Sequence, residues 1–243
     1  MIVFPAIDIL DGRAVRLAQG DYSRVTVYNA DPVAQAQEFV DLGAEWIHVV
    51  DLDGARAGVP GNLDTIERIA RETGARLEVG GGVRTLETMR RLTAAGVERV
   101  VIGTMLVTDP GFVREAVLCC GDGVVAGVDA RDGMVAVEGW RHGTATSAQI
   151  LVGELRELGI RHLVYTDISR DGMRTGINSP AYVGVAVTAG FPVVASGGVS
   201  TLEDIRALAE LGPGVVEGVI TGRALYEGAF TLAEALAAAA GKA

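Results

Sequence analysis

The sequence GGGVRT at residues 80–85 and its near copy SGGVST at residues 196–201 decide how this chain is expected to fold. Each stretch follows a short apolar segment and begins a helix-like segment. Each is then followed by a second apolar segment that reaches a glycine, VIGT at 101–104 and VITGR at 219–223. A glycine turn at a helix start lets backbone N–H groups close on an anion, which the helix dipole also attracts. The two copies therefore predict two phosphate-binding turns and a ligand with two phosphates.

Short β-branched segments alternate with helix-like segments along the whole chain. Strands are expected at residues 2–8, 46–51, 76–79, 99–102, 124–129, 162–167, 193–195 and 215–221. Helices are expected at residues 32–42, 63–73, 86–95, 110–119, 147–158, 181–188, 202–211 and 224–239. Strands that are apolar throughout are typical of parallel sheets covered on both faces. Eight alternating units with right-handed crossovers predict an α/β fold, a closed (βα)8 TIM barrel in a single domain spanning residues 1–243.

The two halves of the predicted barrel resemble each other. AIDILDG at 6–12 matches GVDARDG at 127–133, and VVD at 49–51 before Gly58 matches YTD at 165–167 before Gly176. The members of each pair lie about half a chain length apart, as the two glycine turns do, so each half supplies four βα units. The repeat implies a twofold axis along the barrel, and it places the two glycine turns on opposite sides of one opening.

Composition narrows the classes of function. The net charge of -10 argues against a nucleic-acid-binding surface and against a polybasic membrane anchor. No apolar run reaches the ~18 residues that a membrane span needs, and the first residues have no signal-peptide pattern. The adjacent Cys119 and Cys120 fit neither a disulfide framework nor a zinc site. We therefore expect a cytoplasmic monomer that acts on a small molecule without a metal.

Aspartates end several of the predicted strands, and the active site of a (βα)8 barrel lies at those carboxyl ends. The four residues are Asp8, Asp51, Asp129 and Asp167. Each could cap its loop by accepting backbone N–H bonds, and for Asp51 and Asp167 we expect that structural role. Asp8 and Asp129 each precede an Asp-Gly pair by three residues, and the repeat places them opposite each other. Two carboxylates on opposite faces of a substrate suit general acid and general base catalysis.

Other side chains near the same opening have both a functional and a structural interpretation. Thr166 is a candidate catalytic residue or a neutral packing residue, and Asp171 in the following loop is a candidate catalytic helper. His48 would contact the ligand or be a hydrogen-bonded core histidine, which its apolar neighbours favour. Trp140 would stack on a planar ring or anchor its loop. Arg16 would neutralise a phosphate or lie in a solvated hairpin.

The remaining candidates belong to the glycine turns and their surroundings. Substrate or phosphate binding is predicted for Gly81, Gly82, Arg84, Gly103, Thr104, Gly176, Gly197, Gly198, Gly222 and Arg223. One Gly-Gly-Val turn is weak evidence, because any tight βα loop can use glycine. Two such turns in register with a half-barrel repeat, each followed by a strand that reaches glycine, are strong evidence for a bisphosphate ligand.

In combination, several motifs resemble those of a known family. They are PAID (5–8), DGRAVRL (11–17), QGDY (19–22), VDLDGA (50–55), GGGVR (80–84), TDI (166–168), DG (171–172) and SGGV (196–199). Over essentially its whole length the chain resembles the phosphoribosylformimino-aminoimidazole-carboxamide ribotide isomerases of histidine biosynthesis. Met173 departs from that pattern, since the family often has threonine after this Asp-Gly pair.

The resemblance implies an Amadori rearrangement, aldose to ketose, on a substrate with a phosphate at each end. It implies that Asp129 is the general acid that protonates the ribose ring oxygen. Asp8 would be the general base that removes the C2′ proton. Thr166 would orient a carboxylate or the substrate, and Trp140 would close over the imidazole. The substrate's own iminium would act as the electron sink, so the resemblance implies no metal or organic cofactor.

Three alternatives stay open at this point. The related cyclase of the same pathway shares the fold and the glycine turns, but it typically carries a lysine where this chain has Arg16 and Leu17. A bifunctional branch of the family also isomerises phosphoribosylanthranilate, and the QGDY sequence at 19–22 favours the histidine-only enzyme. A non-catalytic phosphate-binding barrel would have no use for the pairing of Asp8 with Asp129.

Overall fold

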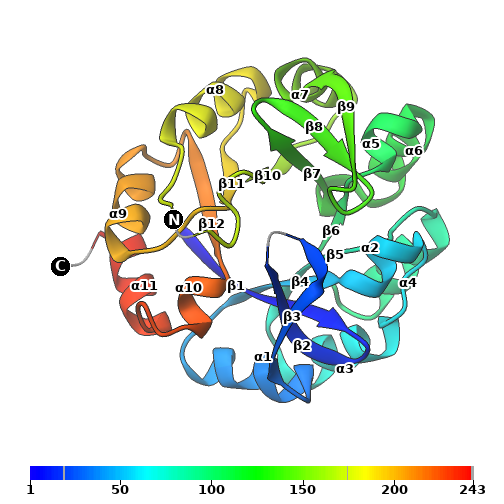
Figure 1. The fold of residues 1–243 in the computed structure, drawn as a ribbon. Helices are drawn as coiled ribbons and strands as arrows, with labels where there is room; N and C mark the ends of the chain where they lie inside the picture. The colour runs from blue at the N-terminus through cyan, green and yellow to red at the C-terminus, as the bar shows by residue number, and fades with distance from the viewer. Residues whose placement is uncertain (19, 174, 242–243) are drawn as a thin grey trace.

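Eight parallel strands of the described chain form a closed ring (Figure 1). The structure is a computed structural model that describes residues 1–18, 20–173 and 175–241. In order around the ring the strands are β1 (Ile2–Leu10), β4 (Trp46–Asp51), β5 (Arg76–Gly80), β6 (Arg99–Ile102), β7 (Val124–Arg131), β10 (His162–Asp167), β11 (Val193–Ser196) and β12 (Val216–Thr221). Parallel pairing of β7 with β10 and of β12 with β1 closes the ring. All of these strands therefore end at one rim.

Helices cover the outside of the ring, at least one after each barrel strand (Figure 1). The long ones are α1 (Pro32–Asp41), α3 (Leu63–Thr73), α4 (Leu86–Ala94), α6 (Pro110–Cys120), α7 (Ala148–Glu157), α8 (Ser179–Ala189), α9 (Leu202–Glu210) and α11 (Leu232–Ala239). Local sequence fixes the start of several of them; for α1, Asp31 accepts the Val33 N–H at 3.0 Å, directly ahead of Pro32. The predicted (βα)8 barrel is confirmed.

Apolar side chains fill the space on both faces of the strands. A large cluster, which includes Ile47 and Leu77, lies between the ring and the helices. A smaller cluster fills the inside of the ring and consists of Phe4, Ala6, Trp46, Val125, Val164, Val194 and Ile220. Burial on both faces is the physical reason why the strands are apolar throughout rather than alternating.

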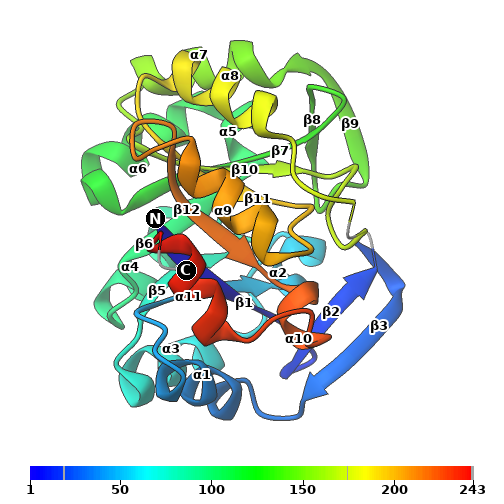
Figure 2. The same cartoon turned by 90° about the vertical axis from the view of Figure 1, so that its left-hand side faces the viewer.

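Two β-hairpins follow barrel strands; the sequence had suggested the first only as one possible setting for Arg16, and had predicted a loop in place of the second. β2 (Arg13–Ala18) pairs with β1 and with β3 (Asp21–Asn29), while β8 (Met134–Val137) pairs with β7 and with β9 (His142–Ser147). Both begin with a two-residue Asp-Gly turn in which both residues have positive φ, Asp11-Gly12 and Asp132-Gly133. Figure 2 shows both hairpins at the same end of the barrel. The half-barrel repeat therefore includes these two hairpins.

The helix predicted at 224–239 is wrong in one respect, because the structure divides it in two. A short helix α10 (Arg223–Tyr226) ends before Gly228, whose φ is +70°. α11 then starts afresh at Thr231, whose side chain and that of Glu234 form a reciprocal capping box. Shorter elements missed by the sequence are α2 (Leu52–Ala57), α5 (Met105–Thr108) and the 3-10 turn η1 (Gly121–Gly123).

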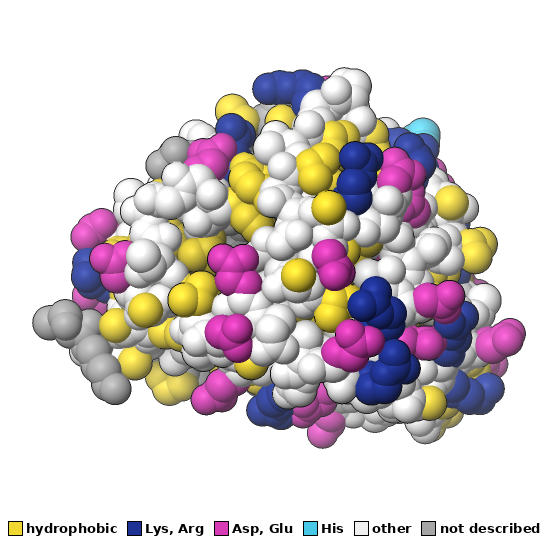
Figure 3. Space-filling model, turned by 90° about the horizontal axis from the view of Figure 1, so that it is seen from below, with side chains coloured by type: hydrophobic (Ala, Val, Ile, Leu, Met, Phe, Trp, Pro, Cys, Tyr) yellow, Lys and Arg dark blue, Asp and Glu magenta, His cyan; other side chains and the backbone are white. Residues whose placement is uncertain are grey.

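The surface carries both signs of charge. Seen from below the view of Figure 1, basic and acidic side chains are interspersed (Figure 3). On α3, for example, Arg68 and Glu72 form an ion pair at 3.2 Å. None of the helices in the described part of the chain is long and apolar enough to cross a membrane.

Candidate active site

One cavity of about 250 Å³ opens at the carboxyl ends of the barrel strands. Of the residues predicted to form the site, its lining includes Asp8, Arg16, His48, Gly81, Gly82, Arg84, Gly103, Thr104, Asp129, Trp140, Thr166, Asp171, Gly197, Gly198, Gly222 and Arg223. Gly176 is not among the lining residues; its carbonyl lies behind the second glycine turn, against Gly198. The structure therefore brings both glycine turns and both catalytic candidates from the repeat to a single site.

Asp8 lies near the end of β1, where an arginine from the first hairpin neutralises it. Arg16 Nη1 donates to Asp8 Oδ1 at 3.0 Å, and each side chain is only 13 % exposed. Burial raises the pKa of Asp8, and the charge of Arg16 partly offsets this rise. Of the two alternatives for Arg16, the solvated one is wrong, because β2 directs this side chain inward to Asp8 and against the backbone of Gly222.

Asp129 lies on β7, opposite Asp8 in the repeat, and receives two side-chain hydrogen bonds. Trp140 Nε1 donates to Asp129 Oδ2 at 2.8 Å, and the Thr166 hydroxyl donates from the neighbouring β10. Burial raises the pKa of Asp129, and these two donors oppose the rise. The indole ring lies against Gly20, where a Cβ would approach it to 2.7 Å. Trp140 thus links the loop between β8 and β9 to a carboxyl group of the cavity.

Asp171 adds a third carboxyl group from the loop after β10. Burial raises its pKa, Arg16 lowers it, and the like charges of Asp8 and Asp129 raise it further. For Arg16, burial alone would lower the pKa, but Asp8 and Asp171 outweigh this effect and the pKa is raised. Because the three carboxyl groups sense one another, their protonation is linked. An acidic and a basic carboxyl group can coexist in such a cluster.

His48 has a buried partner and also lines the cavity. Its Nδ1 lies 2.8 Å from Glu78 Oε1, and Glu78 is completely buried in β5. The two interpretations that the sequence left open, core histidine and cavity residue, therefore describe the same side chain.

The paired glycines of each turn are required by the preceding βα loop. A Cβ on Gly81 would come within 2.2 Å of the Asp51 carbonyl oxygen, and one on Gly197 within 2.6 Å of the Asp167 carbonyl oxygen. All four paired glycines have positive φ. At Gly198 a Cβ would lie 2.3 Å from a carbonyl oxygen of the neighbouring loop. Glycine therefore lets two successive loops meet at the cavity wall.

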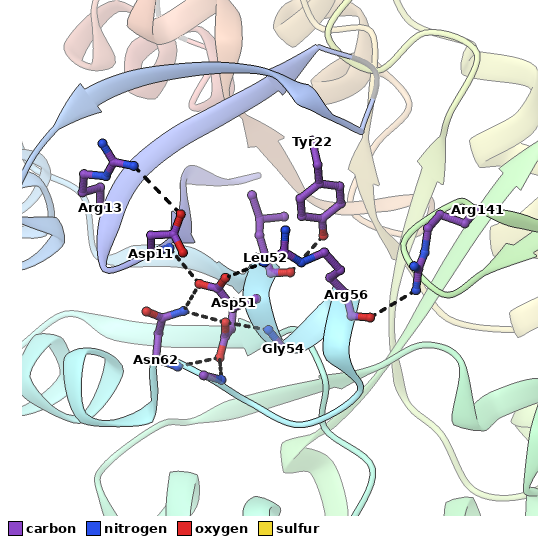
Figure 4. Close-up of polar contacts among 11 residues, drawn as sticks. Asp11, Arg13, Tyr22, Asp51, Leu52, Gly54, Arg56, Asn62 and Arg141 are labelled. Atoms are coloured by element: carbon purple, nitrogen blue, oxygen red, sulfur yellow. Dashed lines mark hydrogen bonds and ion pairs between the residues drawn. The ribbon is translucent and has the colours of Figure 1, made fainter.

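Asp51 and Asp167 have the structural contacts predicted for them. Asp51 caps α2 by accepting the Gly54 N–H at 2.9 Å, and its other oxygen accepts the Gly61 N–H at 2.7 Å (Figure 4). Asp167 accepts the Ser169 N–H at 3.1 Å. Neither carboxylate belongs to the cavity lining.

The arginines and the threonine of the turns are also tied to neighbouring segments. Arg223 Nη1 donates to the Gly172 carbonyl at 2.8 Å, and the Arg84 guanidinium packs on Gly58. The Thr104 hydroxyl accepts a backbone N–H from the loop between β8 and β9 at 3.1 Å. These contacts connect both turns to the loops that border the cavity.

Helix α2 holds the two hairpin arms beside the cavity (Figure 4). The Tyr22 hydroxyl on β3 donates to the Leu52 carbonyl at 2.9 Å, and the Arg56 guanidinium lies 5.3 Å from the centre of the Tyr22 ring. Arg141, in the loop between β8 and β9, donates to the Arg56 carbonyl at 3.1 Å. Arms from the two halves of the barrel thus meet on one short helix.

Sequence reasoning missed Glu78 and the three residues that join the hairpins to α2, namely Tyr22 on β3, Arg56 on α2 and Arg141 in the loop between β8 and β9. The repeated Asp-Gly pairs could have revealed the hairpins that carry two of them, because Asp-Gly between short extended segments predicts a tight β-turn. Gln19, part of the QGDY motif, lies outside the described residues. Within residues 1–18, 20–173 and 175–241, no group of three or more His, Cys, Asp or Glu is placed to hold a metal.

Comparison with known proteins assigns the family. Residues 2–231 match the family described as histidine biosynthesis protein. The chain belongs to this family. A relative from Desulfitobacterium hafniense (strain Y51) is 52 % identical over 238 residues, covering 97 % of this chain and 96 % of its own. A Moorella thermoacetica relative is 49 % identical over 240 residues, with 99 % of both chains covered. Both are named 1-(5-phosphoribosyl)-5-((5-phosphoribosylamino)methylideneamino) imidazole-4-carboxamide isomerase.

A third relative carries the same isomerase name. It comes from Xanthobacter autotrophicus and is 47 % identical over 242 residues, covering 100 % of this chain and 99 % of its own. The family resemblance seen in the sequence motifs is therefore confirmed across the barrel. The match runs through both glycine turns and both hairpins, so it includes every element that borders the cavity.

Proposed function

We propose that this chain catalyses the aldose-to-ketose isomerisation of the N-linked phosphoribosylformimino-aminoimidazole-carboxamide ribotide in histidine biosynthesis. The observation that carries the proposal is the placement of Asp8 and Asp129 in one cavity between two glycine turns, in a chain whose relatives bear that isomerase name over their full length. The name includes two 5-phosphoribosyl groups, which agrees with two anion sites. Each turn would hold one phosphate of the substrate.

In the first step Asp129 acts as the general acid. It donates its proton to the ribose ring oxygen, the C1′–O bond breaks, and the nitrogen lone pair forms an iminium at C1′. Burial raises the pKa of Asp129, which favours the protonated form that this step needs. Trp140 and Thr166 hold the carboxyl group in place from two directions.

In the second step Asp8 acts as the general base. It removes the C2′ proton, and the electron pair of that bond moves into the iminium to give an enolamine. The enolamine becomes the ketose when C1′ gains a proton and the C2′ hydroxyl loses one. Arg16 favours the ionised form of Asp8, while burial makes the carboxylate a stronger base. Each carboxyl group contributes on the order of 10²–10⁴-fold to the rate.

The competing activities make different demands on the protein. Cyclisation by the related enzyme of the pathway needs ammonia, and isomerisation of phosphoribosylanthranilate needs a site that accepts a second aromatic substrate. The relatives named above are isomerases, and this favours isomerisation of the histidine precursor. We also propose that the enzyme is cytoplasmic and monomeric. Light scattering of the purified protein would test the monomeric state.

The proposal is tested by assaying the purified protein on three substrates: the histidine-pathway aminoaldose, phosphoribosylanthranilate, and the cyclase substrate with ammonia. We expect turnover of the first alone. Turnover of phosphoribosylanthranilate at a similar kcat/KM would establish the bifunctional alternative. Absence of turnover on the first substrate by folded protein would refute the proposal. Inorganic phosphate should occupy both glycine turns in a crystal, and density at neither turn would contradict a bisphosphate substrate.

A further inference from the structure

Charged side chains extend from the cavity through the inside of the barrel to its opposite end. His48 Nδ1 lies 2.8 Å from Glu78 Oε1, and Glu78 Oε2 lies 3.7 Å from Arg99 Nη1. Arg99 Nη2 forms an ion pair with Glu217, whose other oxygen lies 3.2 Å from His162 Nδ1. Arg99, His162 and Glu217 stand at the amino-terminal ends of their strands, so this part of the chain is far from the catalytic rim.

Burying the carboxylate of Glu78 at this position costs free energy. Its side chain is fully buried beside the apolar interior cluster, and within the described residues its Oε2 has no hydrogen-bond partner. Removing a carboxylate from water costs several kcal/mol, and the attraction to Arg99 at 3.7 Å offsets only part of this cost. A buried ion pair therefore adds little to folding stability, and a close-packed apolar side chain would stabilise the core as well. The contact that distinguishes Glu78 is the one to His48.

The contact with Glu78 sets which ring atom of His48 is available to the cavity. A carboxylate is an acceptor, so it takes the Nδ1–H of the imidazole. The only other polar atom of the ring is Nε2, and His48 is part of the cavity lining. His48 lies on β4, which pairs with β1 where Asp8 stands, and the ring lines the same cavity as Asp8 and Asp129.

We propose that Glu78 is a positioning residue of the isomerase: by accepting the Nδ1–H of His48, it fixes the imidazole with Nε2 directed to a hydroxyl group of the ring-opened sugar, between Asp8 and Asp129. This inference rests on the proposed function. The required property of Glu78 is an acceptor oxygen at a fixed point, and its negative charge is not required. Histidine ligands and bases are commonly held by such a partner on the second nitrogen.

Three variants separate this role from a structural one. Glu78→Met removes the acceptor at nearly constant volume, and we expect it to lower kcat/KM about 10–100-fold, the range seen for comparable partners of histidine. Glu78→Gln loses the charge but keeps an acceptor oxygen, so kcat/KM should stay within about threefold of wild type. Glu217→Gln breaks the same buried charge network at the far end without touching His48, and it should lower the melting temperature while leaving kcat/KM nearly unchanged.

The tautomer of His48 gives an independent measurement on the unmodified protein. Long-range ¹H–¹⁵N spectra should show a protonated Nδ1 for His48 in wild type and in Glu78→Gln, and a shift toward the Nε2–H tautomer in Glu78→Met. A wild-type His48 with unprotonated Nδ1 would overturn the proposal, as would equal kinetic losses in Glu78→Met and Glu217→Gln. If wild type lacks isomerase activity, the proposed function fails, whereas the spectra still decide whether Glu78 fixes the ring.

Discussion

Replacing Trp140 with phenylalanine should raise the pKa of Asp129, because the indole N–H stabilises the ionised form of this carboxyl group. The donor lies 2.8 Å from Asp129 Oδ2, in a site where burial already disfavours the charge. The six-membered part of the indole packs against Gly20, and phenylalanine keeps an aromatic ring there. The substitution therefore removes one hydrogen bond with little change in the shape of the cavity.

The magnitude follows from the strength of a hydrogen bond to a charged group, about 1.5–3 kcal/mol. A change of 1.36 kcal/mol in the relative stability of the two protonation states alters a pKa by one. Trp140 is half-buried, so water can partly replace the lost donor and the lower end of the range applies. We expect the pKa of Asp129 to rise, because its ionised form loses about 1.5 kcal/mol of stabilisation.

The assay is the pH dependence of kcat/KM, which reports the ionisation of the free enzyme. If Asp129 is the general acid, activity is lost on the alkaline side as it ionises. A higher pKa then moves the alkaline limb to higher pH. Thr166→Val removes the hydroxyl donor on the same carboxyl group and should move the limb in the same direction. An alkaline limb that stays in place or moves to lower pH in both variants would refute the assignment of Asp129 as the acid.

Other perturbations have direct readouts. Asp8→Asn and Asp129→Asn should each lower kcat about 10²–10⁴-fold with little change in melting temperature, and near wild-type kcat in either would remove its catalytic role. Gly198→Ala would place a Cβ 2.3 Å from the Gly176 carbonyl oxygen at a φ of +93°, so chemical denaturation should show a loss of about 2 kcal/mol or more. Thr231→Ala removes the cap of α11 and should cost about 1 kcal/mol without changing kcat/KM. Dialysis against a chelator should leave the rate unchanged, and lost activity restored by a divalent metal would show that carboxyl groups alone are insufficient.

The sequence was sufficient to predict the barrel because local sequence signals specify each βα unit. Apolar β-branched segments and glycine turns at helix starts act within a few residues, so periodicity and spacing reveal them. The repeat added long-range information, since the matching motifs at 6–12 and 127–133 by themselves pair Asp8 with Asp129. The break at Gly228 was missed because helix-forming residues precede it at 223–227 and an alanine-rich segment follows it at 232–239.

The half-barrel repeat and strand order, fixed by sequence alone, determined that two glycine turns and two aspartates share one rim. Only the tertiary structure decided what each side chain meets there. Arg16 could not be assigned to Asp8 until β2 turned back along β1, and Trp140 could not be assigned to Asp129 until its loop folded over the cavity. The pairing of His48 with Glu78 likewise depends on the register of two strands about 30 residues apart in sequence. Hydrogen bonds and charge pairs act over a few ångströms in space, and closure of the barrel alone creates those distances.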